Sequence, residues 1–376
     1  MKKQLSLEKE PKSLSEVCFQ PAVVNTLKKY IKKEIIPQAL YFYGKPGTGK
    51  TSTAKAFIRT LRCLDRKEGH IEPCGKCSVC TSTEDIKFSH ESSNVMWIQR
   101  GLDDSNMKSQ IEKITEYIQY PPSYGSKFKF VVIDELQALS ANYIYTFLTL
   151  SESLPLIKNN VIFIFITMND DSLPETVRDA LTSRTIPFEF ISPTTDSILS
   201  HLIEQFPHFP PSSLSIISRE SERNMRRVYT LLQRCIENDN EELQTDLVAD
   251  TLNVIDDDKR IKLWSLLQSN SNKSYDIIKF TTELLKQGGI EKSLVRDLIE
   301  DIQYCIENDK KEDKLEDQFQ TILLLADYLA SAAPIPLPTF FFILSMKKLK
   351  PINIDILSNR HSKDNGFAII NNQNDV

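Results

Sequence analysis

A glycine-rich loop between residues 44 and 51 carries the strongest chemical signal in the sequence. It fits the pattern G-x-x-x-x-G-K-[ST] and reads Gly44-Lys45-Pro46-Gly47-Thr48-Gly49-Lys50-Thr51. Such a loop turns its backbone N–H groups toward a phosphate chain, and the following helix adds the positive end of its dipole. We expect the loop to hold ATP, with Lys50 at the β- and γ-phosphates and Thr51 on Mg²⁺. A chance glycine-rich turn is the alternative.

Two adjacent carboxylates, Asp134 and Glu135, follow the apolar segment 128–133. A nucleotide hydrolase needs a second magnesium ligand and a group that orients the attacking water. We expect Asp134 to bind Mg²⁺ and Glu135 to orient and deprotonate the water. The alternative is that both residues only begin the next helix, where negative charge complements the helix dipole.

Four cysteines gather within residues 63–80. Three of them follow the spacing C-x-x-C-x-x-C around Gly75, and the full set is Cys63, Cys74, Cys77 and Cys80. Four thiolates suit a closed, tetrahedral, structural zinc site. Reduced, buried cysteines are the alternative, and His70 or His90 is near enough in sequence to replace Cys63 as a ligand. The remaining cysteines, Cys18, Cys235 and Cys305, lie on apolar patterns and are expected in the core.

The elements around these residues alternate between strands and helices. Apolar runs at 39–43, 128–133 and 161–166 are typical of buried strands, and the residues after the loop (Ala54, Phe57, Ile58 and Leu61) recur at helical spacing. This alternation predicts an α/β fold with a parallel, helix-covered sheet. From about residue 193 onward the periodic segments are helical, at 198–203, 225–236, 294–306, 319–329 and 340–349.

Length and composition limit the class of protein. A chain of 376 residues that is 40% hydrophobic has material for two or three cored domains. The longest apolar run, at 161–166, is too short to span a membrane, and residues 1–12 lack the apolar segment of a secretory signal, so we expect a cytoplasmic protein with reduced thiols. A net charge of -5 argues against a surface coated in basic residues, so any DNA contact must be local or shared with partners.

Together these residues resemble the clamp-loader gamma/tau family of bacterial DNA polymerase III, in which a zinc module is inserted just after the P-loop helix of an AAA+ domain. Further segments carry the resemblance over residues 10–235. The segment 134–140 is similar to the family's Walker B region, and Thr167 matches its first sensor position. Other similar elements are Ser183-Arg184-Thr185 for the family's Ser-Arg-Cys, Asn224-Met225-Arg226 for its second sensor, and Pro11 with Gln20 for the segment near the adenine.

The resemblance implies an AAA+ P-loop domain at 1–192 with the zinc module at about 63–80. A helical lid at 193–255 and a helical collar for oligomerisation at 256–350 would follow. The composition of 351–376, which is rich in Asn and other polar residues, predicts a disordered tail. The resemblance also implies that Arg184 acts in trans as an arginine finger on a neighbouring subunit's nucleotide, while Arg226 touches the chain's own γ-phosphate. Solvated arginines are the alternative for both.

The sequence departs from the family's pattern at several positions. Glu10 lies where the family has an arginine, Thr185 lies where it has a cysteine, and Arg223 lies where it has a glycine. About four extra residues precede Ser183-Arg184, which makes Arg178 a rival finger.

The function implied is that of an ATPase subunit of the polymerase III holoenzyme, a nucleotidyltransferase complex, without being its polymerising subunit. ATP, Mg²⁺ and Zn²⁺ would be its cofactors. Its partners would be the delta and delta-prime subunits, further gamma/tau copies, the sliding clamp and primed DNA, with no membrane. The alternative is a delta-prime-like subunit with a structural and arginine-finger role. A nucleotide kinase with a cysteine-zinc lid is disfavoured because the cysteines follow the P-loop helix immediately and a Ser-Arg element follows a separate strand.

Overall fold

The computed structural model describes residues 4–81, 94–98, 104–123, 125–153, 160–168, 170–238, 242–252, 257–268, 274–285, 291–308, 315–330, 336–346 and 352. The chain forms two compact units. One comprises Met1–Thr194 with Arg223–Arg227, and the other comprises Thr195–Glu222 with Val228–Val376. The predicted division into four parts stays a prediction. The predicted tail at 351–376 lies outside the described residues except for Ile352.

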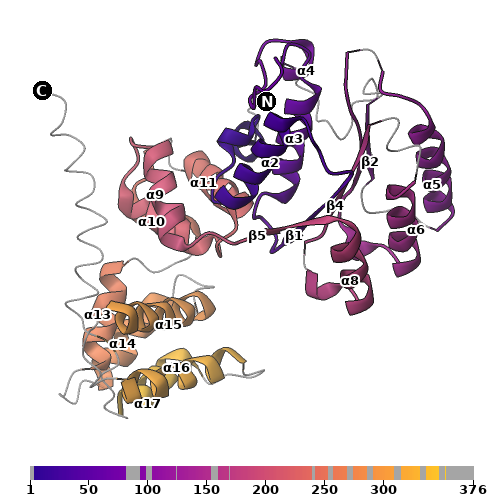
Figure 1. Ribbon diagram of the computed structural model, residues 1–376. Coiled ribbons are helices and arrows are strands. Elements are labelled where there is room, and N and C mark those ends of the chain that lie inside the picture. Colours follow the sequence, from indigo (N-terminus) through magenta and orange to yellow (C-terminus); the bar gives the residue numbers. More distant parts are fainter. Residues whose placement is uncertain are drawn as a thin grey trace, which may run out of the picture. The chain divides into compact units, whose positions relative to one another are not determined.

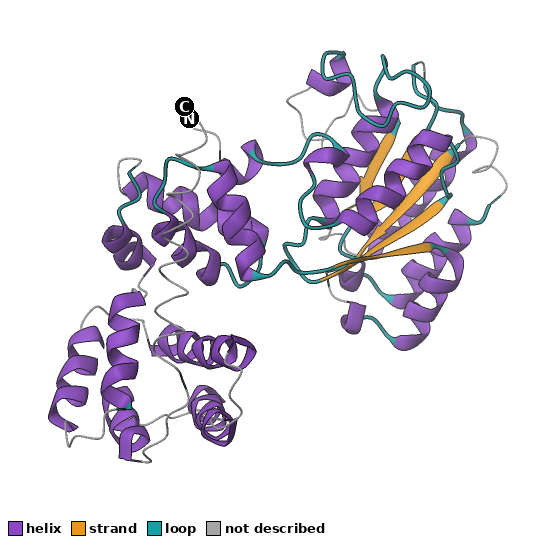
Figure 2. Ribbon diagram, turned by 60° about the vertical axis from the view of Figure 1, so that its left-hand side comes forward, coloured by secondary structure: helices purple, strands orange, loops and turns teal. Residues whose placement is uncertain are grey.

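The first unit is built on a five-stranded sheet whose paired strands all run parallel (Figures 1 and 2). Its strands are β1 (Ala39–Gly44), β2 (Val95–Ile98), β3 (Lys129–Ile133), β4 (Val161–Ile166) and β5 (Ile186–Phe190), in the order β2-β3-β4-β1-β5. The predicted fold class is confirmed. The sequence did not predict β2, which has four residues, or β5, whose proline and exposed positions are tolerated because it lies at the edge of the sheet.

Helices cover both faces of this sheet (Figure 1). On one side lie α2 (Pro21–Lys33) and α3 (Lys50–Arg62), and on the other lie α5 (Asp104–Gln119), α6 (Ala141–Ser151) and α8 (Glu175–Arg184). Successive side chains of β1 therefore enter different cores: Leu40 and Phe42 pack with α2 and α3, while Ala39 and Tyr41 pack with α5, α6 and α8. Burial on both faces explains why β4 is an uninterrupted apolar run.

The strand order brings the chemically interesting residues to one edge. Because β4 lies between β3 and β1, its carboxyl end is flanked by the loop after β1 and by the two carboxylates after β3. In open parallel sheets, ligands bind outside the carboxyl ends of the strands. Short elements complete this unit, namely α1 (Leu5–Glu8), η1 (Leu14–Glu16), α4 (Ser78–Thr81), η2 (Leu136–Ala138) and η3 (Asp170–Ser172).

The described part of the second unit is helical, as predicted. Its helices are α9 (Thr195–Gln205), α10 (Pro211–Glu220), α11 (Met225–Asn238, whose first turn belongs to the first unit), α12 (Thr245–Leu252), α13 (Asp257–Leu267), α14 (Ser274–Leu285), α15 (Glu291–Asn308), α16 (Leu315–Ala330) and α17 (Leu337–Met346). A core cluster joins α13 to α17 and contains a buried polar group, in which Asp301 accepts hydrogen bonds from Arg260 (2.8 Å) and Trp264 (2.9 Å).

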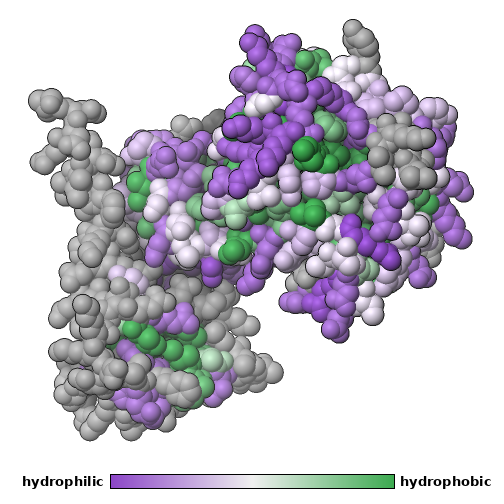
Figure 3. All heavy atoms as spheres, in the orientation of Figure 1, coloured by the Kyte–Doolittle hydropathy of each residue, from purple (hydrophilic) through white to green (hydrophobic). Residues whose placement is uncertain are grey.

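The surface of the first unit and the three cysteines outside the four-cysteine cluster can be compared with the sequence predictions. Figure 3 shows a mostly hydrophilic face on the first unit, with small hydrophobic patches. None of the described helices is long and apolar enough to cross a membrane. Cys235 and Cys305 are buried as predicted, but the prediction for Cys18 was wrong. Cys18 lies after η1, half-exposed, with its sulfur 3.5 Å from the carbonyl oxygen of Glu16.

Candidate nucleotide and metal sites

The glycine-rich loop joins the end of β1 to the start of α3, as predicted. Gly44, Gly47 and Gly49 have φ values of 136°, 75° and 94°, which L side chains rarely adopt. Close approach also matters at Gly47, where an added Cβ would lie 1.9 Å from the side-chain oxygen of Asn224. The backbone can curl here only because these positions are glycines.

Lys50 lies inside the curl of the loop. Its Nζ donates hydrogen bonds to the carbonyl oxygens of Gly44 (2.8 Å) and Lys45 (2.7 Å), and lies 3.3 Å from the Thr48 hydroxyl. The residue is 5% exposed, and this burial lowers the pKa of Lys50 to about 8, with Arg226 also lowering it and Asp134 raising it. An ammonium whose hydrogen bonds go to neutral oxygens gains from any anion that enters the loop.

Thr51 and Asp134 meet across the sheet edge. The Thr51 hydroxyl donates to Asp134 Oδ2 at 3.3 Å, and the other carboxylate oxygen accepts the N–H of Glu135 at 3.1 Å. A hydroxyl and a carboxylate oxygen at this spacing fit Mg²⁺, which takes few protein ligands and retains several waters. Glu135 has a φ of 60°, and its side chain forms no cap hydrogen bond to η2.

Thr167 follows β4 at the same edge. Its N–H donates to the carbonyl oxygen of Phe42 on β1 (3.0 Å), and its hydroxyl lies 3.0 Å from Oε1 of Gln137. The same oxygen accepts the N–H of Met168 at 3.2 Å. No sequence pattern singles out Gln137, because its contact with the end of β4 spans thirty residues along the chain.

The start of α11 rests on the glycine-rich loop. Met225 donates its N–H to the carbonyl oxygen of Gly47 (3.2 Å), while the side chain of Asn224 accepts the N–H groups of Arg226 (3.0 Å) and Arg227 (3.2 Å). Arg226 is exposed and near enough to Lys50 to affect its pKa. The predicted second-sensor segment is therefore beside the predicted phosphate site.

Two residues that depart from the family's pattern, Glu10 and Arg223, interact with nearby groups of the first unit. Glu10 forms an ion pair with the buried Lys55 of α3 at 2.8 Å. Arg223 has a φ of 61°, and its guanidinium donates to the carbonyl oxygens of Pro193 (2.7 Å) and Ser192 (3.3 Å). These hydrogen bonds offset the strain of a left-handed arginine.

Gln20 connects three parts of the first unit. Its buried side-chain amide donates to the carbonyl oxygens of Thr48 (3.3 Å) and Ile191 (2.8 Å), and its oxygen accepts the N–H of Ile191 (3.2 Å). The predicted adenine-side segment therefore contacts the glycine-rich loop directly.

Both finger candidates lie on α8. Arg184, at its last residue, is 3.5 Å from Glu152, and its side chain is 41% exposed. Arg178 is 3.5 Å from Asp171 with a side chain 34% exposed. Exposed ion pairs of this kind contribute little stability, so either guanidinium is available to another chain at small cost. The choice between them stays a prediction.

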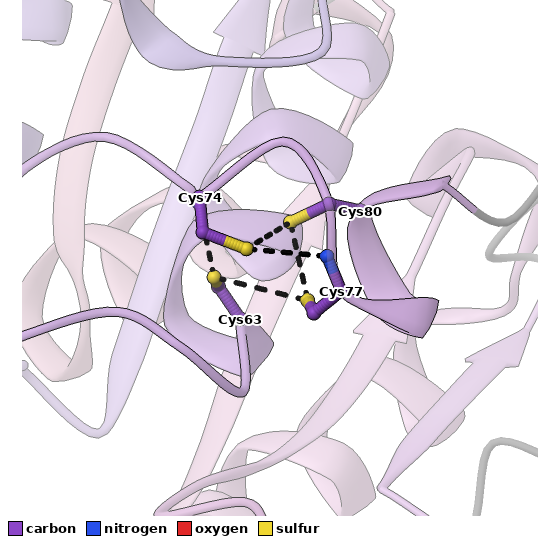
Figure 4. A group of neighbouring side chains, drawn as sticks. All are labelled: Cys63, Cys74, Cys77 and Cys80. Carbon is purple, nitrogen blue, oxygen red and sulfur yellow. Dashed lines mark hydrogen bonds between the residues drawn. The ribbon is translucent and has the colours of Figure 1, made fainter.

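The four predicted cysteines come together at the end of α3 (Figure 4). Their sulfur atoms all lie within 4.8 Å of one another, with Cys63–Cys77, Cys74–Cys80 and Cys77–Cys80 at 4.0, 3.9 and 3.5 Å. Zinc–sulfur bonds of about 2.3 Å place the sulfurs of a tetrahedral site about 3.8 Å apart, so the set fits zinc.

Backbone groups support the same interpretation of the cysteine cluster. N–H groups of Cys74 and Cys77 point at the sulfurs of Cys63 (3.1 Å) and Cys74 (3.3 Å), which favours thiolates. Of the alternative ligands, His70 is exposed and outside the cluster, and His90 lies outside the described residues.

Several known proteins are similar in sequence to this chain. The family model described as "DNA polymerase III, delta subunit" matches residues 19–194. Protein STICHEL-like 2 of Arabidopsis thaliana is 30% identical over 73% of this chain and 31% of its own length. DNA polymerase III subunit tau of Bacillus subtilis is 26% identical over 77% of this chain and 49% of its own. Subunit gamma of Buchnera aphidicola is 27% identical over 70% of this chain and 68% of its own.

The chain thus spans about a third of the length of STICHEL-like 2 and about half of the length of the Bacillus subtilis tau subunit. Among solved structures, the RuvB branch-migration motor of Thermotoga maritima is similar over 85% of this chain and 92% of its own, at 16% identity and a TM-score of 0.45. The chain is thus similar to the gamma and tau subunits of DNA polymerase III over 70–77% of its length.

Proposed function

We propose that the chain binds ATP with Mg²⁺ and hydrolyses it. The observation that carries this proposal is the approach of the Thr51 hydroxyl to Asp134 at 3.3 Å, directly beside Lys50 in the glycine-rich loop. Residues from β1, α3 and β3 thus form one polar site at the carboxyl edge of the sheet, where phosphates are expected to bind.

Each residue has a distinct role in this proposal. Lys50 exchanges the loop carbonyls for the β- and γ-phosphate oxygens, a gain because charge-assisted hydrogen bonds are stronger than those to neutral oxygens. Thr51 and Asp134 would hold Mg²⁺, which neutralises charge on the phosphates. Glu135 orients the attacking water and takes its proton. Its backbone N–H, bonded to Asp134, fixes its position relative to the metal ligand.

The wider function we propose is that of a clamp-loader subunit, which uses ATP to place a sliding clamp on primed DNA. The support is the similarity to proteins named as DNA polymerase III tau and gamma subunits. Partners would be the delta and delta-prime subunits and further copies of gamma/tau, with Arg184 reaching a neighbour's nucleotide. A purely structural, delta-prime-like role is not favoured because Lys50, Thr51, Asp134 and Glu135 are all present beside the loop.

We also propose a structural zinc held by the four cysteines. Cys63 directly follows α3, the helix that begins with Lys50. A fixed ligand at its far end would limit movement of the phosphate-binding end, since a helix of this length behaves as a short rod.

The test is an ATPase assay on the chain purified with its clamp-loader partners, with and without sliding clamp and primed DNA. We expect clamp and DNA together to stimulate hydrolysis, and Lys50→Ala to abolish nucleotide binding while the chain stays folded. Unchanged nucleotide affinity in folded Lys50→Ala protein would refute the site, and hydrolysis indifferent to clamp and DNA would refute the clamp-loading role.

A further inference from the structure

The orientation of the Gln137 amide follows from its contacts. The backbone N–H of Met168 can only donate, so the Gln137 atom 3.2 Å away must be the amide oxygen. The same oxygen lies 3.0 Å from the Thr167 hydroxyl. Because an amide oxygen carries no hydrogen, the hydroxyl proton must point toward it. The Thr167 hydroxyl therefore donates its one hydrogen bond to Gln137.

This arrangement limits what each side chain can offer a nucleotide. Phosphate oxygens only accept hydrogen bonds, and Thr167 is 0% exposed with its proton already donated. Gln137 is half-buried and retains an NH₂ group with two donors on the other side of its amide. Of these two side chains, that of Gln137 has N–H groups that can donate hydrogen bonds to phosphate oxygens.

The fold places Gln137 where those donors are needed. It lies on η2, two residues after Glu135, and its amide reaches the end of β4. β4 in turn is bonded through Thr167 to Phe42 of β1, just before the glycine-rich loop. The amide thus bridges the segment that carries the magnesium ligand and the strand next to the loop.

We propose that Gln137, rather than Thr167, contacts the γ-phosphate of bound ATP, and that Thr167 is a positioning residue that aims the Gln137 amide. This rests on the proposed binding of ATP. The hydroxyl of Thr167 and the N–H of Met168 fix the amide oxygen, so both hydrogens of the NH₂ group remain for the ligand.

The experiment measures the affinities of the full chain for ATPγS and for ADP, each with Mg²⁺. Their ratio reports contact with the γ-phosphate, and the ADP affinity reports an intact loop. The variants are Gln137→Met, Thr167→Val, the double variant, and Gln137→Glu, which keeps the acceptor for Thr167 and Met168 but lacks the donors. Gln110→Met, at a half-buried glutamine on α5, is the matched control.

We expect Gln137→Met and Gln137→Glu to lower the ATPγS preference about tenfold or more, since each loses a hydrogen bond to a charged group. Thr167→Val should lower it less, because the N–H of Met168 still holds the amide oxygen. In the Gln137→Met background, Thr167→Val should change nothing further, because its effect passes through the amide.

Three outcomes overturn this assignment. They are a wild-type preference retained in Gln137→Met, a wild-type preference retained in Gln137→Glu, and an undiminished effect of Thr167→Val in the double variant. If the wild type and Gln110→Met bind neither nucleotide, the proposed ATP site fails as well, so the two failures are distinguishable.

Discussion

Lys50 and Lys55 offer a matched test of how the site affects stability. Both lie on α3 and both are 5% exposed, but Lys55 is paired with Glu10 at 2.8 Å whereas Lys50 is held by backbone carbonyls. Lowering the pKa of Lys50 from 10.5 to about 8 corresponds to roughly 3 kcal/mol of destabilisation at neutral pH. Hydrogen bonds lost on truncation offset about 1 kcal/mol of this.

We therefore expect Lys50→Met to raise the free energy of unfolding of the nucleotide-free chain by about 2 kcal/mol. For a unit of this size that corresponds to roughly 4–8 °C in melting temperature. Lys55→Met should do the opposite, because it leaves Glu10 without its partner. Differential scanning calorimetry of both variants without nucleotide measures the two shifts.

The pH dependence supplies a second measurement. Between pH 8 and 10.5 the unfolded chain binds a proton at Lys50 that the native state releases, so the stability of the wild type should rise through this range. Lys50→Met should lack that rise. A variant Lys50→Met that is less stable than the wild type at pH 7, or that keeps the full rise, would show that burial of this lysine is not the dominant cost.

Three further predictions concern other parts of the chain. Freshly prepared protein should contain about one zinc per chain by elemental analysis and Cys77→Ser none, and unchelated protein without zinc would contradict the four-cysteine site. Arg184→Ala should leave nucleotide binding intact but lower hydrolysis in the assembled complex on the order of 10³-fold. If Arg178→Ala causes that loss and Arg184→Ala has no effect, Arg178 is the arginine finger. Burial raises the pKa of Asp297 from 3.8 to about 7 despite the nearby Arg260, so the helical unit should lose stability as pH rises from about 4 to 7, and Asp297→Asn should abolish that loss in urea unfolding. An unchanged pH profile in Asp297→Asn would disprove it.

Local chemistry was readable from the sequence because it depends on spacing along the chain. The glycine-rich loop, the carboxylate pair and the four cysteines each lie within a short segment, and their residue types limit what they can bind. The buried strands β1, β3 and β4 were readable for the same reason, since burial on both faces leaves uninterrupted apolar runs. Those patterns were sufficient to predict the fold class and that the loop and the carboxylates follow the ends of buried strands.

Only the tertiary structure decided which distant residues complete the site. Asn224 packs against Gly47, and Gln137 accepts the hydrogen bond that the Thr167 hydroxyl donates, although neither pair is close in sequence. The edge strand β5 was missed because its half-exposed pattern resembles a loop. The low pKa of Lys50 likewise depends on how deeply folding buries it. Contacts between separate segments leave no periodic pattern in either segment, so they become visible only once the sheet order has brought the segments together.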